Sequence, residues 1–174
     1  ILIARDLRKA GLDVGHPRRR ALDALTAGDG EAGADGFRLA LSVDLATPEP
    51  ATLLVICRSS PEPVDRDAVE GLAASVLKER ERSDGSRLAG ALVAAAFAQD
   101  AVTAASDSGV ALLRVADARA SFDATGYGPR GHYPMWLPEY VLEVPARDAA
   151  GLPTFTMLGQ GDGARLLAAL GLED

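Results

Sequence analysis

The feature that most constrains the fold is a short, nearly unbroken apolar run from Leu53 to Cys57, which lies between two pairs of prolines. Pro50 ends the pair before the run, and Pro61 begins the pair after it. A run of this length is typical of a strand buried on both faces, because a strand with one wet face alternates polar and apolar residues. We therefore expect a strand over 52–58 at the centre of a sheet.

Strands and helices alternate around this run. Phe37 to Leu45 alternates apolar and polar residues, which predicts a strand with one face in solvent. Asp65 is suited to cap a helix whose expected apolar face comprises Val69, Leu72, Ala73, Val76 and Leu77. The pattern then predicts a strand over 88–96, a helix over 98–108 and a strand over 110–115. This alternation needs crossover connections, so we expect the sheet to be partly parallel.

Both ends of the chain predict further elements. Helical spacing over 1–10 is followed by Gly11, a residue that often ends a helix, and 15–36 has the composition of a loop. The C-terminal part predicts a structured loop over 121–138, a hairpin of strands 140–144 and 154–158, and a helix over 164–170. Since the sequence opens on Ile1, a targeting signal further upstream would not be visible.

Composition narrows the class of protein. Of the 174 residues, 48% are hydrophobic and 25% charged, as in an ordinary globular chain. A net charge of -7 argues against a protein that coats nucleic acid. The longest apolar stretches, such as Ala89 to Ala98, are well short of the roughly 20 residues that span a bilayer, so we expect no membrane partner. The one cysteine, Cys57, cannot form an internal disulfide, which favours a cytoplasmic protein.

Three segments between Gly33 and Asp117 carry a family resemblance. They are the strand end Ile56-Cys57-Arg58, the turn Phe97-Ala98-Gln99-Asp100-Ala101 and the strand Gly109-Val110-Ala111-Leu112-Leu113. In order and spacing they resemble the Mrr-type restriction endonuclease domain of the PD-(D/E)xK superfamily. The resemblance implies an α/β fold, in which a restriction-endonuclease-like mixed sheet over 1–120 is flanked by helices. We expect a C-terminal extension of loop, hairpin and helix over 121–174, packed on the same domain.

The positions that carry the chemistry of this family differ in this chain. The family uses an acidic residue on one strand and a Gln or Glu with a Lys on the next, so that Mg²⁺ and the lysine together stabilise the phosphoryl transition state. Here Ile56 stands at the Gln position and Arg58 at the Lys position, while Arg38 stands where the resemblance places the metal-binding aspartate. Ile56 has no side-chain oxygen, and a planar guanidinium does not readily replace a compact ammonium.

The resemblance and these three substitutions together imply a catalytically degenerate domain that needs no cofactor and acts as a scaffold or recognition module in DNA processing or defence. One alternative is an active Mg²⁺-dependent endonuclease with a rearranged site, in which Asp44 binds the metal beside Arg58 and Glu70 supplies a further acid. That alternative predicts that the carboxylates converge near Arg58. The other alternative is a protein–protein assembly subunit.

Two further groups of residues are candidates for contact with DNA or another anion. Arg18, Arg19 and Arg20 form a basic triplet, and Arg130 and His132 lie in the loop rich in glycine and aromatic residues. The partners that these residues imply are DNA or a protein, and a second copy of the chain is a further expected partner.

Overall fold

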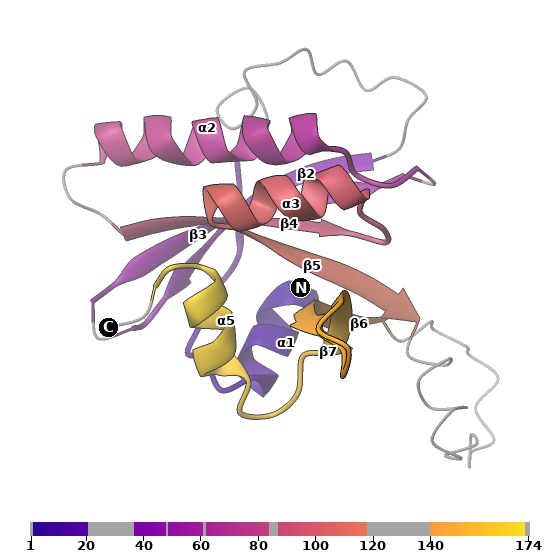
Figure 1. Cartoon of the computed structure of the whole chain (residues 1–174). Coiled ribbons are helices and arrows are strands. Elements are labelled where there is room, and N and C mark those ends of the chain that lie inside the picture. Colours follow the sequence, from indigo (N-terminus) through magenta and orange to yellow (C-terminus); the bar gives the residue numbers. More distant parts are fainter. Residues whose placement is uncertain are drawn as a thin grey trace, which may run out of the picture.

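A mixed sheet of seven strands, with helices on both faces, forms the centre of the molecule in the computed structural model (Figure 1). The structure describes residues 2–20, 37–47, 49–60, 62–83, 87–117 and 140–172. Helices α2 (Arg66–Arg82) and α3 (Gln99–Ser108) lie on one face of the sheet. Helices α1 (Leu2–Lys9) and α5 (Gly163–Ala169) lie on the other. The expected α/β fold with a mixed sheet flanked by helices is confirmed.

The strands follow one another across the sheet in the order of the sequence, from β1 to β7. Crossovers through α2 and α3 make β3, β4 and β5 parallel, and all other neighbouring strands are antiparallel. The strands are β1 (Arg18–Arg19), β2 (Phe37–Leu45), β3 (Ala51–Ser59), β4 (Arg87–Ala94), β5 (Val110–Asp117), β6 (Tyr140–Arg147) and β7 (Pro153–Met157). The expected parallel section and the C-terminal hairpin are therefore both present.

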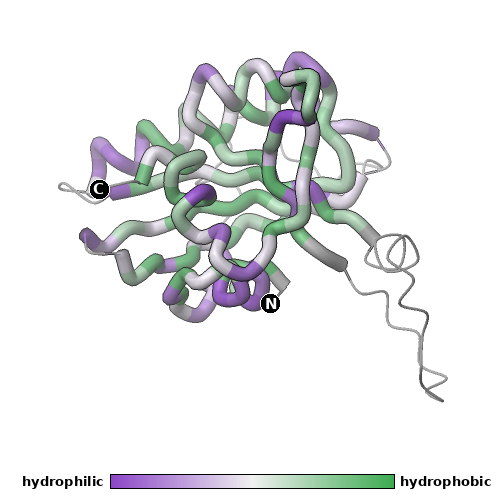
Figure 2. Tube along the Cα trace, turned by 60° about the horizontal axis from the view of Figure 1, so that its bottom comes forward, coloured by the Kyte–Doolittle hydropathy of each residue, from purple (hydrophilic) through white to green (hydrophobic). Residues whose placement is uncertain are grey.

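Each face of the sheet has its own hydrophobic core. Figure 2 shows hydrophobic stretches running through the strands in the middle of the molecule. Under α2 and α3, the core includes Leu54, Ile56, Leu72, Leu92 and Leu112. The core on the opposite face includes Leu7, Leu53, Val55, Leu113 and Leu166. Successive residues of β3 thus alternate between the two cores, which explains why its sequence is an unbroken apolar run.

Helix α2 begins where the sequence indicates and packs closely on β4. The carboxylate of Asp65 accepts a hydrogen bond from the N–H of Ala68 at 3.1 Å, so Asp65 is the N-cap. Further along, α2 crosses β4 at Gly90, where an added Cβ would lie 3.0 Å from Val76 Cγ2 and 3.2 Å from Leu72 Cγ. The absence of a side chain at Gly90 therefore allows the close approach of helix and sheet.

The structure corrects two predictions of exposure. Part of the polar face expected for β2 is covered: Ala40 and Ser42 are each only 1% exposed, and Ala40 belongs to the core that packs under α2 and α3. On α2, Leu77 was expected in the core but is 58% exposed, while Ser75 is buried in the face that packs on the sheet. Ser75 tolerates this position because its hydroxyl donates a hydrogen bond to the carbonyl oxygen of Gly71 at 2.9 Å.

Two elements at the edges of the molecule complete the fold. The sequence predicted a loop around Arg18, but Arg18 and Arg19 pair with β2 as the edge strand β1. At the other end of the chain, the N–H of Gly163 donates to the carbonyl oxygen of Ala10 at 2.8 Å and joins α5 to the end of α1. Among the described helices, none combines the length and apolar character needed to cross a bilayer.

Candidate functional site

The ladder between β2 and β3 brings together the positions that the family resemblance marks as catalytic. Arg38 lies opposite Arg58, and Ala40 lies opposite Ile56. The N–H of Arg20 donates to the carbonyl oxygen of Ala40 at 3.0 Å, which places a third arginine beside the same part of the ladder. Arg20, Arg38 and Arg58 are called the arginine site below.

Within the arginine site, the side chain of Arg58 has the environment that bears most directly on function. It is half-buried near the carboxyl end of β3, and its guanidinium has no hydrogen bond or ion pair with any of the residues that the structure describes. A guanidinium carries five donors and keeps its charge at all physiological pH values. A half-buried guanidinium that pairs with no described residue is suited to binding an anion such as a phosphate group.

Asp44 does not reach Arg58. In the antiparallel hairpin Asp44 lies opposite Thr52, six positions along β3 from Arg58, which corresponds to about 20 Å of extended strand. Its two oxygens also have other partners: Oδ1 accepts from the Thr52 hydroxyl at 3.2 Å, and Oδ2 accepts from Arg18 at 2.5 Å. The metal site expected from Asp44 and Arg58 is therefore not assembled, because the register places the two residues at opposite ends of the strands.

Glu70 forms an ion pair with Arg66 on the exposed surface of α2. Its Oε1 accepts a hydrogen bond from Arg66 Nε at 2.5 Å, one turn earlier on α2, and both side chains are more than half exposed. This hydrogen bond raises the pKa of the Arg66 guanidinium. Within the described part of the chain, no three His, Cys, Asp or Glu side chains gather as metal ligands would. The carboxylates expected to converge in a rearranged nuclease site do not do so.

The other predicted anion-binding residues fall into two sets. Arg18, Arg19 and Arg20 are exposed at the edge of the sheet, and Arg18 is held by its ion pair with Asp44. Arg130 and His132 lie outside the described residues, as does the whole of the predicted loop over 121–138. The triplet thus contributes Arg20 to the arginine site, and Arg18 is partly neutralised.

Cys57 lies next to this site but has the environment of a core residue. Its side chain packs against the core on the α1 and α5 face. Burial raises the pKa of the Cys57 thiol, which lowers the fraction of reactive thiolate at neutral pH. This environment does not suit a nucleophile.

The sequence marked Arg20 as an anion-binding candidate but did not place it beside Arg38 and Arg58, because the two-residue strand β1 that precedes it leaves no periodic pattern. The pairing of Arg20 with Ala40 became visible only once β1 was placed on β2.

No protein-family model, curated protein or solved structure matches this chain. The resemblance to the Mrr-type domain therefore stays a prediction from the residues quoted for it.

Proposed function

We propose that this chain is a catalytically degenerate restriction-endonuclease-like module, which acts as a scaffold or recognition element in DNA processing or defence. The observation that carries the proposal is the β2–β3 register, with Arg38 opposite Arg58 and Ala40 opposite Ile56. In the family that the sequence resembles, carboxylates and a lysine occupy this part of the two strands. The element order from β2 through β5 also agrees with the order that the resemblance implies.

The chemistry of the arginine site favours binding of phosphate over cleavage of a phosphodiester. Cleavage requires a group that activates water and a cation that holds the transition state. A guanidinium that pairs with no described residue, such as that of Arg58, can hold a phosphate without further groups. The net charge of -7 repels DNA from the rest of the chain. We therefore expect weak binding that depends strongly on salt.

The test is a titration of fluorescently labelled duplex DNA with the full chain at several salt concentrations. Arg58→Gln is expected to weaken binding to all DNA sequences alike and to reduce the slope of log K against log salt by about 1. Arg82→Gln is the matched control, because Arg82 ends α2, far along the chain from the arginine site, and is exposed. A wild-type chain that binds no DNA at low salt would exclude the recognition role.

A second experiment addresses catalysis directly. The purified chain is incubated with DNA in the presence of Mg²⁺ or Mn²⁺, and we expect no cleavage. Cleavage that Asp44→Ala abolishes would overturn the proposal and support the active-endonuclease alternative. The buried thiol of Cys57, the only cysteine, is compatible with the cytoplasm, which is the compartment we propose for this role.

A protein-binding role is a second candidate function, because the part of β5 before Arg114 faces a cleft and pairs with no described strand there. A second copy of the chain is one candidate partner there.

A further inference from the structure

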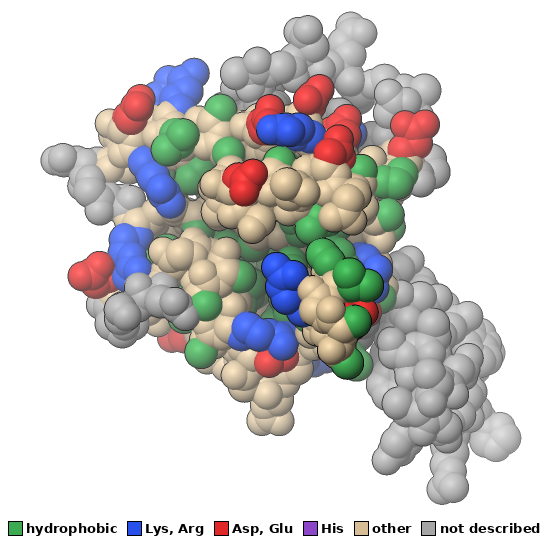
Figure 3. Space-filling model, in the orientation of Figure 1, with side chains coloured by type: hydrophobic (Ala, Val, Ile, Leu, Met, Phe, Trp, Pro, Cys, Tyr) green, Lys and Arg blue, Asp and Glu red, His purple; other side chains and the backbone are tan. Residues whose placement is uncertain are grey.

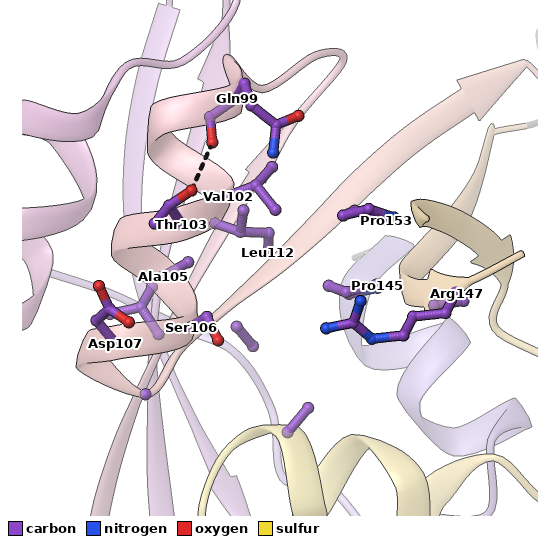
Figure 4. Close-up of a pocket in the computed structure, with 15 residues that line it drawn as sticks. Gln99, Val102, Thr103, Ala105, Ser106, Asp107, Leu112, Pro145, Arg147 and Pro153 are labelled. Atoms are coloured by element: carbon purple, nitrogen blue, oxygen red, sulfur yellow. Dashed lines mark hydrogen bonds between the residues drawn. The ribbon is translucent and has the colours of Figure 1, made fainter. Parts of the chain in front are cut away.

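A cleft of about 560 Å³ separates α3 and the start of β5 from the β6–β7 hairpin and α5 (Figure 4). Its walls include Val102 and Thr103 of α3, Leu112 of β5, and Pro145 and Arg147 of β6. In Figure 3 the same face shows hydrophobic side chains in the space between the upper helices and the lower layer. The volume lies within the range of about 300 to 1,000 Å³ in which proteins bind ligands.

The cleft exists because the ladder between β5 and β6 stops early. The last pair before the cleft is Arg114 opposite Glu143. Continuing this register would place Pro145 opposite Leu112, and proline has no N–H to donate. Beyond Glu143, β6 pairs only with β7, as far as Arg147. The edge of β5 before Arg114 is therefore left open.

The direction of the backbone groups follows from one hydrogen bond. The N–H of Leu158 donates to the carbonyl oxygen of Leu142 at 2.8 Å, so Leu142 directs its backbone groups toward the β7 side. By alternation Glu143 faces β5, and its partner Arg114 faces β6. The backbone groups of Leu112 and Val110, two and four residues before Arg114, therefore face the cleft, where no described strand pairs with them.

The wall of the cleft formed by β6 also directs backbone hydrogen-bonding groups into the cleft. By the same alternation, the carbonyl of Pro145 and the N–H and carbonyl of Arg147 face the cleft. Val110 and Leu112 are buried residues, 5% and 1% exposed, and buried backbone groups are nearly always hydrogen-bonded. No described strand pairs with these two facing rows of backbone donors and acceptors, which match the hydrogen-bonding pattern of an extended chain.

The charge in the cleft favours an acidic occupant. Figure 4 shows the guanidinium of Arg147 extending from β6 into the space toward α3, whereas Asp107 points away on the far side of that helix. One nitrogen of Arg147 donates to the carbonyl oxygen of Gly151 at 2.8 Å, which holds the side chain in place and leaves other donors available. At the neighbouring end of the hairpin, the stacked rings of Phe97 and Phe155, with centroids 5.9 Å apart, join β7 to the turn before α3.

We propose that this cleft binds an extended, acidic peptide segment of a partner protein, which adds a strand to the open edge of β5. The backbone of the peptide pairs with Val110 and Leu112, and a carboxylate of the peptide pairs with Arg147. Proteins that add a peptide as a strand at a sheet edge recognise it in this way, with affinity from the backbone and specificity from the side chains.

The test begins with selection of random seven-residue peptides on the full-length chain, followed by binding of the synthetic peptides measured by fluorescence anisotropy. We expect peptides rich in β-branched residues and in Asp or Glu. Methylation of alternate backbone nitrogens of the peptide is expected to weaken its binding about tenfold or more, because it removes the N–H donors that pair with β5. Arg147→Gln is expected to weaken binding of the acidic peptides about threefold to fivefold, while Arg82→Gln leaves it unchanged.

Amide hydrogen exchange locates the binding site without changing the protein. A bound peptide is expected to slow exchange at Val110, Leu112 and Arg147. Failure to enrich any peptide, or enriched peptides that leave exchange at these three amides unchanged, would overturn the proposal. Protection that rises with protein concentration alone would assign the cleft to a second copy of the chain. Protection by free acetate or glutamate to the same extent would assign it to a small anion.

Discussion

Gly90 shows how a single missing side chain sets the distance between a helix and the sheet. We expect Gly90→Ala to lower the free energy of unfolding by about 1 to 3 kcal/mol, since its Cβ would press against Leu72 and Val76 in a core that has no space for it. Gly71→Ala is the control, because an added Cβ there meets nothing within 4 Å and alanine favours the helix. Chemical denaturation measures both, and a Gly90→Ala variant as stable as wild type would contradict this account of the packing.

The environment of Cys57 predicts how the stability of the protein changes with pH. Because the folded-state pKa of the thiol is raised, the folded chain holds this proton to higher pH than the unfolded chain. The contribution of the thiol to stability is therefore fully present below the unfolded pKa of about 8.5 and is lost as the pH rises from there through the folded pKa. Urea unfolding should show a larger loss of stability between pH 7 and pH 10 for wild type than for Cys57→Ala. Equal losses would show that burial of the thiol has no such effect.

At the scale of elements, the sequence predicted the positions of the strands and helices better than it predicted which of their residues are buried. The apolar run in β3 and the cap at Asp65 carry local signals, and both elements formed where expected. The burial of Ala40 and Ser42 depends on packing between elements, which periodicity along β2 does not contain. Leu77 fits the helical spacing of the apolar face, but the sheet does not extend to cover it.

The cap of α2 gives a prediction for an element. Asp65→Ala removes the acceptor of the Ala68 N–H and should cost about 1 kcal/mol of stability. Asp65→Asn, which keeps a side-chain oxygen, should recover most of the loss. Thermal unfolding of the two variants checks this, and an equal loss in both would show that the charge near the helix N-terminus matters more than the hydrogen bond.

At the scale of the whole molecule, the candidate site could be predicted only in part. The resemblance to the Mrr-type domain marked the positions Arg38, Ile56 and Arg58, but the separation of Asp44 from Arg58 depends on the register of a hairpin. The cleft beside β5 has a visible cause in the sequence, since Pro145 interrupts a strand pattern. The interruption at Pro145 forms a cleft only because α3 and α5 lie on either side of it, and no local sequence pattern specifies the positions of these helices.

The contact between α5 and α1 predicts that the two terminal helices depend on each other for their stability. A Cβ on Gly163 would lie 2.8 Å from the backbone oxygen of Ala10, and backbone cannot move aside as a flexible side chain can. Gly163→Ala should therefore speed amide exchange in both terminal helices, and we expect it to lower the free energy of unfolding by about 1 to 3 kcal/mol. Ala164→Ser, an exposed change in the next residue, is the control. Unchanged exchange in α1 would show that the two helices do not depend on each other.

The order of the strands has a consequence for synthesis on the ribosome. Since every strand pairs with the one that precedes it in the sequence, the sheet can grow by one strand at a time as the chain emerges. No strand has to wait for a distant partner, so few unpaired edges are exposed during translation. The packing of α1 against α5 joins elements far apart in the sequence, so it closes the core on that face of the sheet once α5 has formed.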